Sequence, residues 1–131
     1  MSKIHITKHD LQRLSSLLEK KLRLDEYDLA LKAELQSALV VEPEDIPEDV
    51  ITMNSQVQLK DDNGQSEIFT LVFPEDSDFS ENKVSILSPI GCSLIGYRIG
   101  STVKFPTPKG DQHLTVEKIL YQPERAGDFN L

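Results

Sequence analysis

The chain has 131 residues, a mass of 14.8 kDa and a formal net charge of −8. This length accommodates one ordinary domain, or a small domain with a short appendage, and excludes a large multidomain enzyme. The balance of 22 acidic against 14 basic residues has the wrong sign for binding nucleic acid through its phosphates. With Cys92 as its only cysteine, the chain has no internal disulfide and no cysteine-built zinc site.

The apolar runs of the sequence are short. They fall well below the roughly twenty residues that a membrane-spanning helix requires, and the N-terminal residues contain no apolar signal core. We therefore expect a cytoplasmic protein without a membrane partner.

The first forty residues contain no glycine and no proline, and their apolar residues recur at helical spacing. Thr7 and Asp10 are spaced like a capping box, with Asp in place of Glu. One leucine stripe follows this cap, and a second begins after Asp25 and Asp28, either of which could cap its helix. The first stripe comprises Leu11, Leu14, Leu18 and Leu22; the second comprises Leu31, Leu35, Ala38 and Leu39.

Two helices joined by a short turn predict an antiparallel hairpin, a short two-helix coiled coil at residues 1–41. A first helix of about fourteen residues would be only about 21 Å long. The alternative is that the two helices cover the second half as part of one core. Residues 42–51 contain five acids and two prolines, which predict an ordered or semi-extended linker.

From residue 52 onward the pattern changes to that of strands. Val57 and Leu59 alternate with polar residues, and a turn at 61–64 separates this strand from a second one at 66–73. Further strands are expected at 83–87, 101–105 and 114–121, and a short helix should begin at Pro89 and end at Gly96. The chain thus has α+β character, with residues 52–131 forming a small antiparallel sheet and one short helix.

Three groups of residues are candidates for chemistry. His5 and His9 have the spacing of a metal pair on a helix, but His5 precedes the expected cap and no third ligand is nearby, so we expect no metal site. Cys92 has no basic neighbour in sequence, which favours a buried, unreactive thiol. The acids of the hairpin turn could share a divalent ion with a partner, although helix capping is the simpler interpretation. These acids are Asp25, Glu26 and Asp28.

The stretch from 84 to 121 resembles the C-terminal domain of the Gre transcript-cleavage factors of bacterial RNA polymerase. The resemblance covers about forty residues, and it is carried by the order and spacing of several short features. They are Ser88-Pro89-Ile90, Leu94-Ile95-Gly96, Gly100 before a strand, Pro108 and Gly110 in a turn, and Ile119 with Tyr121 in the last strand.

A broader resemblance, to the Rnk regulators, covers nearly the whole chain. These regulators are relatives of the Gre factors with a shortened helical arm. The matching segments are the connector 43–49, residues 50–55, the Ser-Pro-Ile-Gly segment at 88–91, and the tail 121–128. The resemblance implies an FKBP-like fold for the second half, which agrees with the strand pattern.

The resemblance also implies a partner, because Gre-type proteins dock on the rim of the RNA polymerase secondary channel and insert their coiled coil into the pore. The segment around Ser-Pro contacts the rim, so Ser88, Pro89 and Ile90 become the candidate polymerase-binding residues. Leu87 departs from the family, in which a polar residue commonly precedes Ser-Pro. In the cleavage factors an Asp-x-x-Glu pair at the arm tip helps to hold a catalytic magnesium ion, whereas this chain has Asp25 and Asp28 on a short arm.

We therefore expect a non-enzymatic regulator, monomeric and without a cofactor, that occupies the secondary-channel entrance and competes with Gre-type factors. An arm of about 21 Å would not bring a carboxylate within the roughly 2 Å at which Mg²⁺ ligands bind. Two alternatives stay open: a cleavage cofactor that acts through its tip acids, and a free-standing protein-interaction module.

Overall fold

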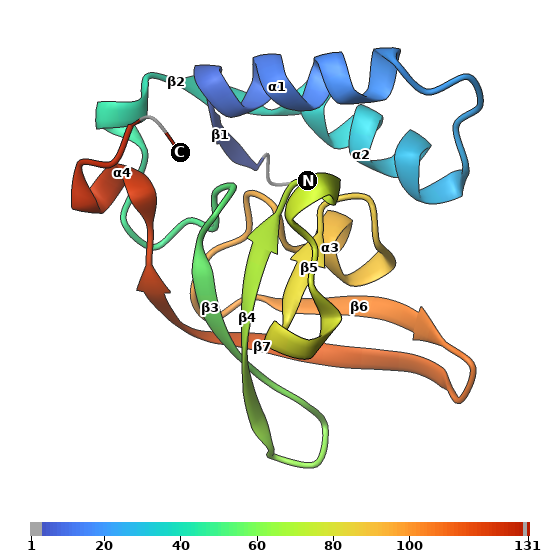
Figure 1. The fold of residues 1–131 in the computed structure, drawn as a ribbon. Helices are drawn as coiled ribbons and strands as arrows, with labels where there is room; N and C mark the ends of the chain where they lie inside the picture. The colour runs from blue at the N-terminus through green and yellow to red at the C-terminus, as the bar shows by residue number, and fades with distance from the viewer. Residues whose placement is uncertain (1–3, 130) are drawn as a thin grey trace.

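The computed structural model describes residues 4–129 and 131, without the side chains of 105–107. Helices and strands form an α+β fold in which two helices lie over a curled sheet (Figure 1). Among the described residues, no helix is long and apolar enough to cross a membrane. In chain order the helices and strands are β1 (His5–Thr7), α1 (Lys8–Glu19), α2 (Glu26–Ser37), β2 (Leu39–Val41), β3 (Gln56–Lys60), β4 (Ser66–Val72), β5 (Lys83–Ser85), α3 (Pro89–Leu94), β6 (Thr102–Thr107), β7 (Gly110–Tyr121) and α4 (Pro123–Ala126).

Both predicted helices of the N-terminal half are present, but each ends before the last residue of its leucine stripe. Thr7 caps α1 by accepting a hydrogen bond from the Asp10 amide at 3.1 Å. Because Asp25 fixes the start of α2 at Glu26, residues 20–25 must form the turn, and Leu22 lies there fully exposed. The inclusion of Leu22 in the first stripe was therefore wrong. The second stripe also ends early, since Leu39 lies in β2 and is half-exposed.

The hairpin helices bury their leucines against the rest of the protein. Leu14 and Leu31 are almost completely buried and belong to the same apolar cluster as Ile51, Leu71 and Leu94. The hairpin therefore shares one core with the sheet, as the alternative interpretation of the stripes anticipated, and its stripe is not free to pair with a second copy. Burial of these side chains stabilises the fold by roughly 1.5–3 kcal/mol each.

The connecting segment is packed rather than loose. Val50 and Ile51 are completely buried, and Ile46 is nearly so. The segment carries a short 3-10 turn at Pro43–Asp45. The carboxylate of Asp10 on α1 is completely buried. It links α1 to the residues just after the connecting segment by accepting a hydrogen bond from the Met53 amide at 3.1 Å.

The main sheet has five strands in the order β5-β4-β3-β7-β6. Pairing is antiparallel except between β4 and β5, which run parallel. The expectation of a purely antiparallel sheet was therefore wrong at this edge. The reason is the connection through residues 73–82, which is long enough to turn back and start β5 beside Thr70, so that both strands run in the same direction.

Two further differences concern strands. A second, two-stranded sheet pairs β1 with β2 in parallel, which the helical pattern of the first forty residues hid. The hairpin of β6 and β7 is longer than expected, with Pro106 paired opposite Asp111. Pro106 lies beyond the strand expected at 101–105, but it belongs to β6, an edge strand, where a residue without an N–H is tolerated.

Candidate functional site

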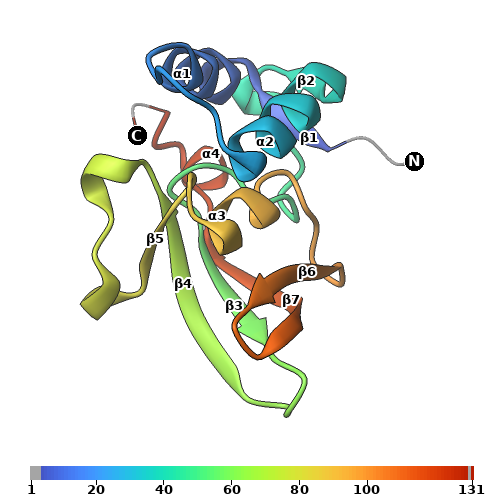
Figure 2. The same ribbon diagram turned by 90° about the vertical axis from the view of Figure 1, so that its right-hand side faces the viewer.

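The tip acids and the Ser-Pro segment, the two groups that the family resemblance concerns, lie on neighbouring elements. The tip acids are at the start of α2, and the Ser-Pro segment starts α3, against which α2 packs. Both views show α3 beside α2 (Figures 1 and 2). Burial is the main cause of the raised pKa of the Cys92 thiol on α3, and the nearby charges of Asp25 and Asp28 raise this pKa further. The fold thus gathers both groups at one side of the molecule.

Asp25 and Asp28 form a reciprocal capping box at the start of α2. Asp25 Oδ1 accepts a hydrogen bond from the Asp28 amide at 2.8 Å, and Asp28 Oδ2 accepts one from the Asp25 amide at 3.0 Å. These bonds satisfy two of the four amides that a helix N-terminus leaves unpaired. The capping role that the sequence suggested for these acids is confirmed.

Asp28 is buried and paired, with only 1% of its side chain exposed. Its Oδ2 also accepts a hydrogen bond from Lys21 Nζ at 2.5 Å. Burial by itself would raise the pKa of Asp28, but the bonds from Lys21 and from the Asp25 amide outweigh burial and hold the pKa below its ordinary value. The same bond to Asp28 is the main cause of the raised pKa of Lys21. The Asp28 carboxylate is therefore ionised at neutral pH and turned into the protein.

The exposed acids of the tip are Asp25 and Glu26. Glu26 lies beside Tyr27, whose pKa is raised by burial first and then by the charge of this carboxylate. Among the described residues there is no group of three or more His, Cys, Asp or Glu side chains arranged to hold a metal ion. His5 lies in β1 and His9 on α1, so these two residues do not share a helix face.

The Ser88 hydroxyl is built into the turn that starts α3. It accepts a hydrogen bond from the Gly91 amide at 3.1 Å and donates one to the Ser85 carbonyl at 2.6 Å. Pro89 occupies the first turn, where its missing N–H costs nothing. The Ser88 side chain is thus used internally, and the next two residues, Pro89 and Ile90, are both half-buried.

Gly91 is required for the close approach of this turn to β5. A Cβ atom at position 91 would lie 1.9 Å from the Ser85 carbonyl oxygen, far inside van der Waals contact. The Ser-Pro-Ile-Gly sequence thus fixes the backbone that presents Pro89 and Ile90. The segment is a hydrogen-bonded helix start rather than an irregular loop.

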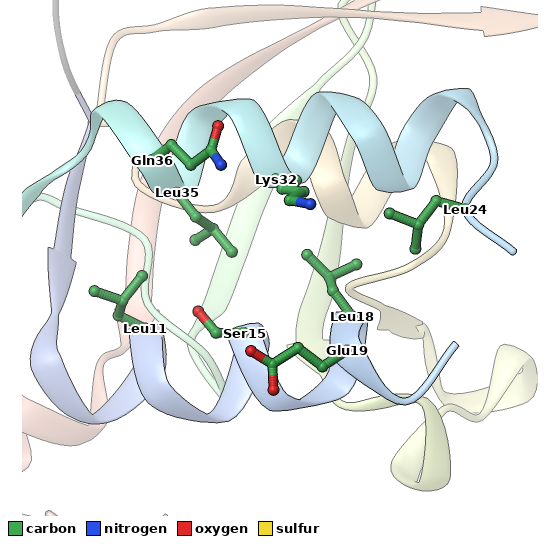
Figure 3. A pocket seen from close by; sticks show the side chains of 8 residues that line it. All are labelled: Leu11, Ser15, Leu18, Glu19, Leu24, Lys32, Leu35 and Gln36. Atoms are coloured by element: carbon green, nitrogen blue, oxygen red, sulfur yellow. The ribbon is translucent and has the colours of Figure 1, made fainter. Parts of the chain in front are cut away.

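An apolar groove of about 310 Å³ runs between α1 and α2. Figure 3 shows that Leu11 and Leu18 of α1 point toward Leu35 of α2 across this space, with Leu24 at the end nearest the turn. Ser15, Glu19, Lys32 and Gln36 supply its polar lining. The seam of the hairpin is therefore partly open.

Two structural partners were missed in the sequence. Lys21 precedes Asp28 by seven residues across a turn, so no helical spacing signals their contact. Arg13 pairs with Asp10 and lies 4.6 Å from the centroid of the Phe73 ring, which joins α1 to the end of β4. Only the spacing of Arg13 and Asp10 on one helix could have indicated the first of these contacts.

Two family models match the chain. Residues 46–121 match the family described as "Transcription elongation factor, GreA/GreB, C-term". Residues 2–41 match the family described as "Rnk N-terminus". The two matched ranges together span both the helical hairpin and the five-stranded sheet.

Individual proteins show the same relationship. The "Regulator of nucleoside diphosphate kinase" of Escherichia coli (strain K12) is 40% identical over 104 residues, which are 78% of this chain and 76% of that protein. The "Transcription elongation factor GreA" of Chlorobium phaeovibrioides (strain DSM 265 / 1930) is 37% identical over 92 residues, which are 69% of this chain and 58% of that factor. A solved structure, described as a prokaryotic transcription elongation factor GreA/GreB from Nitrosomonas europaea, superimposes with a TM-score of 0.82 at 37% identity. The superposition covers 92% of this chain and 100% of that one.

Proposed function

The chain belongs to the GreA/GreB transcription elongation factor family, with an Rnk N-terminus, and from this membership we propose that it is a transcription regulator that binds RNA polymerase. It occupies the entrance of the secondary channel and competes there with Gre-type factors. It does not stimulate transcript cleavage. It acts as a monomeric binding protein rather than as an enzyme.

The absence of cleavage rests on one observation, the use of the tip carboxylates inside the fold. Asp28 is buried, caps α2 and pairs with Lys21, so it is not available to a metal ion in another protein. One carboxylate oxygen of Asp25 accepts a hydrogen bond from the Asp28 amide and is occupied by it. A cleavage factor needs free carboxylates, since a ligand of Mg²⁺ must approach to about 2 Å.

The size and placement of the hairpin support the same conclusion. α1 has 12 residues and would be about 18 Å long at 1.5 Å per residue. The hairpin also lies along the domain, with its leucines in the common core, instead of projecting from it. We propose that it narrows the channel mouth without reaching the catalytic centre.

The proposal extends to the architecture of the sheet with α3 and to that of the helical hairpin. We assign the sheet and α3 to the FKBP-like architecture implied by the family, and the hairpin to its shortened coiled coil. The open seam between the helices supports a hairpin that packs on the domain more tightly than on itself.

Docking on the polymerase rim is assigned to Pro89 and Ile90, presented by the Ser88 cap. Replacing Ser88 would disturb the turn, whereas Pro89 can be changed without removing the cap.

The test is the affinity of the chain for core RNA polymerase, measured with and without a competing Gre factor. Pro89→Arg places a long charged side chain on the docking segment and should weaken binding by about tenfold or more, as loss of an interface anchor does. Pro43→Arg is the matched control, because Pro43 is also a half-buried proline in the first turn of a short helix. Equal affinities for the two folded variants would remove this segment from the interface, and an unaltered affinity in the presence of the Gre factor would refute competition.

One observation favours a second candidate, a cleavage cofactor. Asp25 and Glu26 are adjacent and exposed at the tip, so a pair of carboxylates is still presented to a partner. Release of RNA fragments by the chain itself would support this candidate.

A further inference from the structure

The connection between β4 and β5 carries an exposed aromatic side chain in acidic surroundings. We call residues 74–82 the acidic loop; it contains the short turns Pro74–Asp76 and Phe79–Glu81. Phe79 is 98% exposed. The loop holds four acids and no Lys or Arg. The acids are Glu75, Asp76, Asp78 and Glu81.

The acidic loop is held in one conformation by its own hydrogen bonds. Asp78 Oδ1 accepts bonds from the Ser80 amide at 3.0 Å and hydroxyl at 2.6 Å, and the backbone of Asp78 bridges that of Lys83. Asn82, at a φ of 54°, donates from Nδ2 to the Ile68 carbonyl at 3.1 Å and so ties the loop to β4. The exposure of Phe79 is therefore a property of an ordered turn.

The acidic loop and the docking segment lie before and after β5, an edge strand of the sheet. The loop leads directly into β5, which is only three residues long and is followed by Ser88 and Pro89. Figure 2 shows the loop running beside β5 along this edge. Ile68, on the strand to which the loop is tied, is also exposed.

Isolated apolar side chains on a protein surface are common and need no partner. Phe79 differs because the backbone of the loop that carries it is already ordered by hydrogen bonds. Binding therefore does not have to bear the entropy cost of ordering this loop. Aromatic residues are enriched among the anchors of protein interfaces, and a group of like charges favours a surface of opposite charge. A pocket that fits this feature is apolar in its centre and lined by Lys or Arg at its rim.

We propose that Phe79 is a second anchor of polymerase docking, which inserts into an apolar, basic-rimmed pocket next to the site that receives Pro89 and Ile90. This inference rests on the proposed function and names a contact beyond it. The acids of the loop orient the approach, and Phe79 supplies the affinity.

The first test compares the affinity of Phe79→Ser and Phe129→Ser for core RNA polymerase. Both positions are exposed phenylalanines, but Phe129 lies after α4, outside the acidic loop. Phe79→Ser should weaken binding by about tenfold or more, and Phe129→Ser should leave it within about twofold. Unchanged far-UV circular dichroism and urea midpoints will show that both variants are folded.

The second test separates charge at this loop from charge in general. A double variant of the acidic loop carries Glu75→Gln and Asp76→Asn and keeps Glu81, which pairs with Lys83 at 3.1 Å; its control carries Glu42→Gln and Glu44→Gln in the connecting segment. Both change the net charge by the same amount. Only the loop variant should lower the association rate and flatten its dependence on salt, because steering acts where the charges face the partner.

The outcomes distinguish the inference from the function on which it rests. Binding of the wild type together with equal affinities of the two serine variants would overturn the role of Phe79 and leave the proposed function intact. Failure of the wild type to bind polymerase would overturn both. Self-association that Phe79→Ser abolishes, with polymerase affinity unchanged, would assign the anchor to a second copy and overturn the inference.

Discussion

Asp28→Asn should destabilise the protein, although its position in the sequence suggests a free acid at the tip of an arm. The substitution removes the charge from the bonds with Lys21 Nζ and the Asp25 amide, which lie at 2.5 and 3.0 Å. Bonds to a charged group contribute about 1.5–3 kcal/mol, of which the remaining amide oxygen would recover part. The other carboxylate oxygen, Oδ1, is buried without a hydrogen-bond partner among the described residues. In the variant, the side-chain amide nitrogen would occupy that place as an unpaired donor, at a further cost of about 1–3 kcal/mol.

The sum predicts a loss of about 2–4 kcal/mol in the free energy of unfolding. Urea unfolding followed by far-UV circular dichroism should show it as a fall in midpoint of about 1–2 M, given the usual denaturant dependence of a small domain. Asp25→Asn is the matched control, because Asn is as good an N-cap as Asp and the side chain is exposed, so its midpoint should stay close to that of the wild type. A loss below about 0.5 kcal/mol for Asp28→Asn, well under the cost of burying an unpaired polar group, would refute a structural role for this acid.

The pH dependence of the same pair of proteins provides a second check. Because the pKa of Asp28 is lowered in the folded state, its stabilisation is fully present above the unfolded pKa of about 4. It is lost as the pH falls through the lower folded value. The difference in stability between the wild type and Asp28→Asn should therefore shrink below pH 4, and a difference that grew there would contradict the assigned direction of the shift.

Two further predictions follow from single contacts. Gly91→Ala should lower the free energy of unfolding by more than about 2 kcal/mol, because a Cβ atom 1.9 Å from the Ser85 carbonyl oxygen forces β5 and α3 apart; a urea midpoint equal to that of the wild type would disprove this. The hydroxyl of Tyr121 donates a hydrogen bond to Asp128. This bond is the main cause that raises the pKa of Tyr121 to about 12. Absorbance titration of tyrosinate should therefore contain a component near pH 12 that Tyr121→Phe removes, and this contact should stop stabilising the fold as the pH rises from about 10 to 12.

In the helical hairpin, the sequence pattern predicted the helices but not the surface against which they pack. Leucine spacing located both helices, and the caps at Thr7 and Asp25 were foreseeable from residue type. The pattern could not show which way the stripes faced, because an apolar stripe reads the same against a partner helix as against a sheet. The burial of Leu14 and Leu31 in the common core answers this.

The sheet shows a different limit. Alternation and turn residues indicated β3 and β4, where the chain reverses locally at 61–65. The parallel β5 and the pairing of β1 with β2 depend on contacts between distant segments, which a local pattern does not encode. A proline in β6 was tolerated because the strand lies at an edge, and its place in the sheet becomes known only from the topology.

For the candidate site, the sequence supplied residues but not the contacts that they make inside the fold. Family resemblance pointed to Ser88, Pro89 and the tip acids, and the fold brings the two groups to neighbouring helices. The sequence could not show that Ser88 bonds to the Ser85 carbonyl or that Asp28 pairs with Lys21. Both contacts depend on hydrogen-bond geometry in the folded chain. The exposure of Phe79 could not be predicted, because a single exposed residue in a loop leaves no periodic pattern in the sequence.

Transcript cleavage in a backtracked elongation complex tests the central claim most directly. Addition of this chain alone should release no 3′ RNA fragment, and it should slow the cleavage driven by a Gre factor in proportion to its occupancy of the channel. The tip variant with Asp25→Asn and Glu26→Gln should compete within a few fold of the wild type, because exposed charges contribute about 1 kcal/mol or less each. Fragment release by the wild type that this variant loses while still binding polymerase would contradict the account.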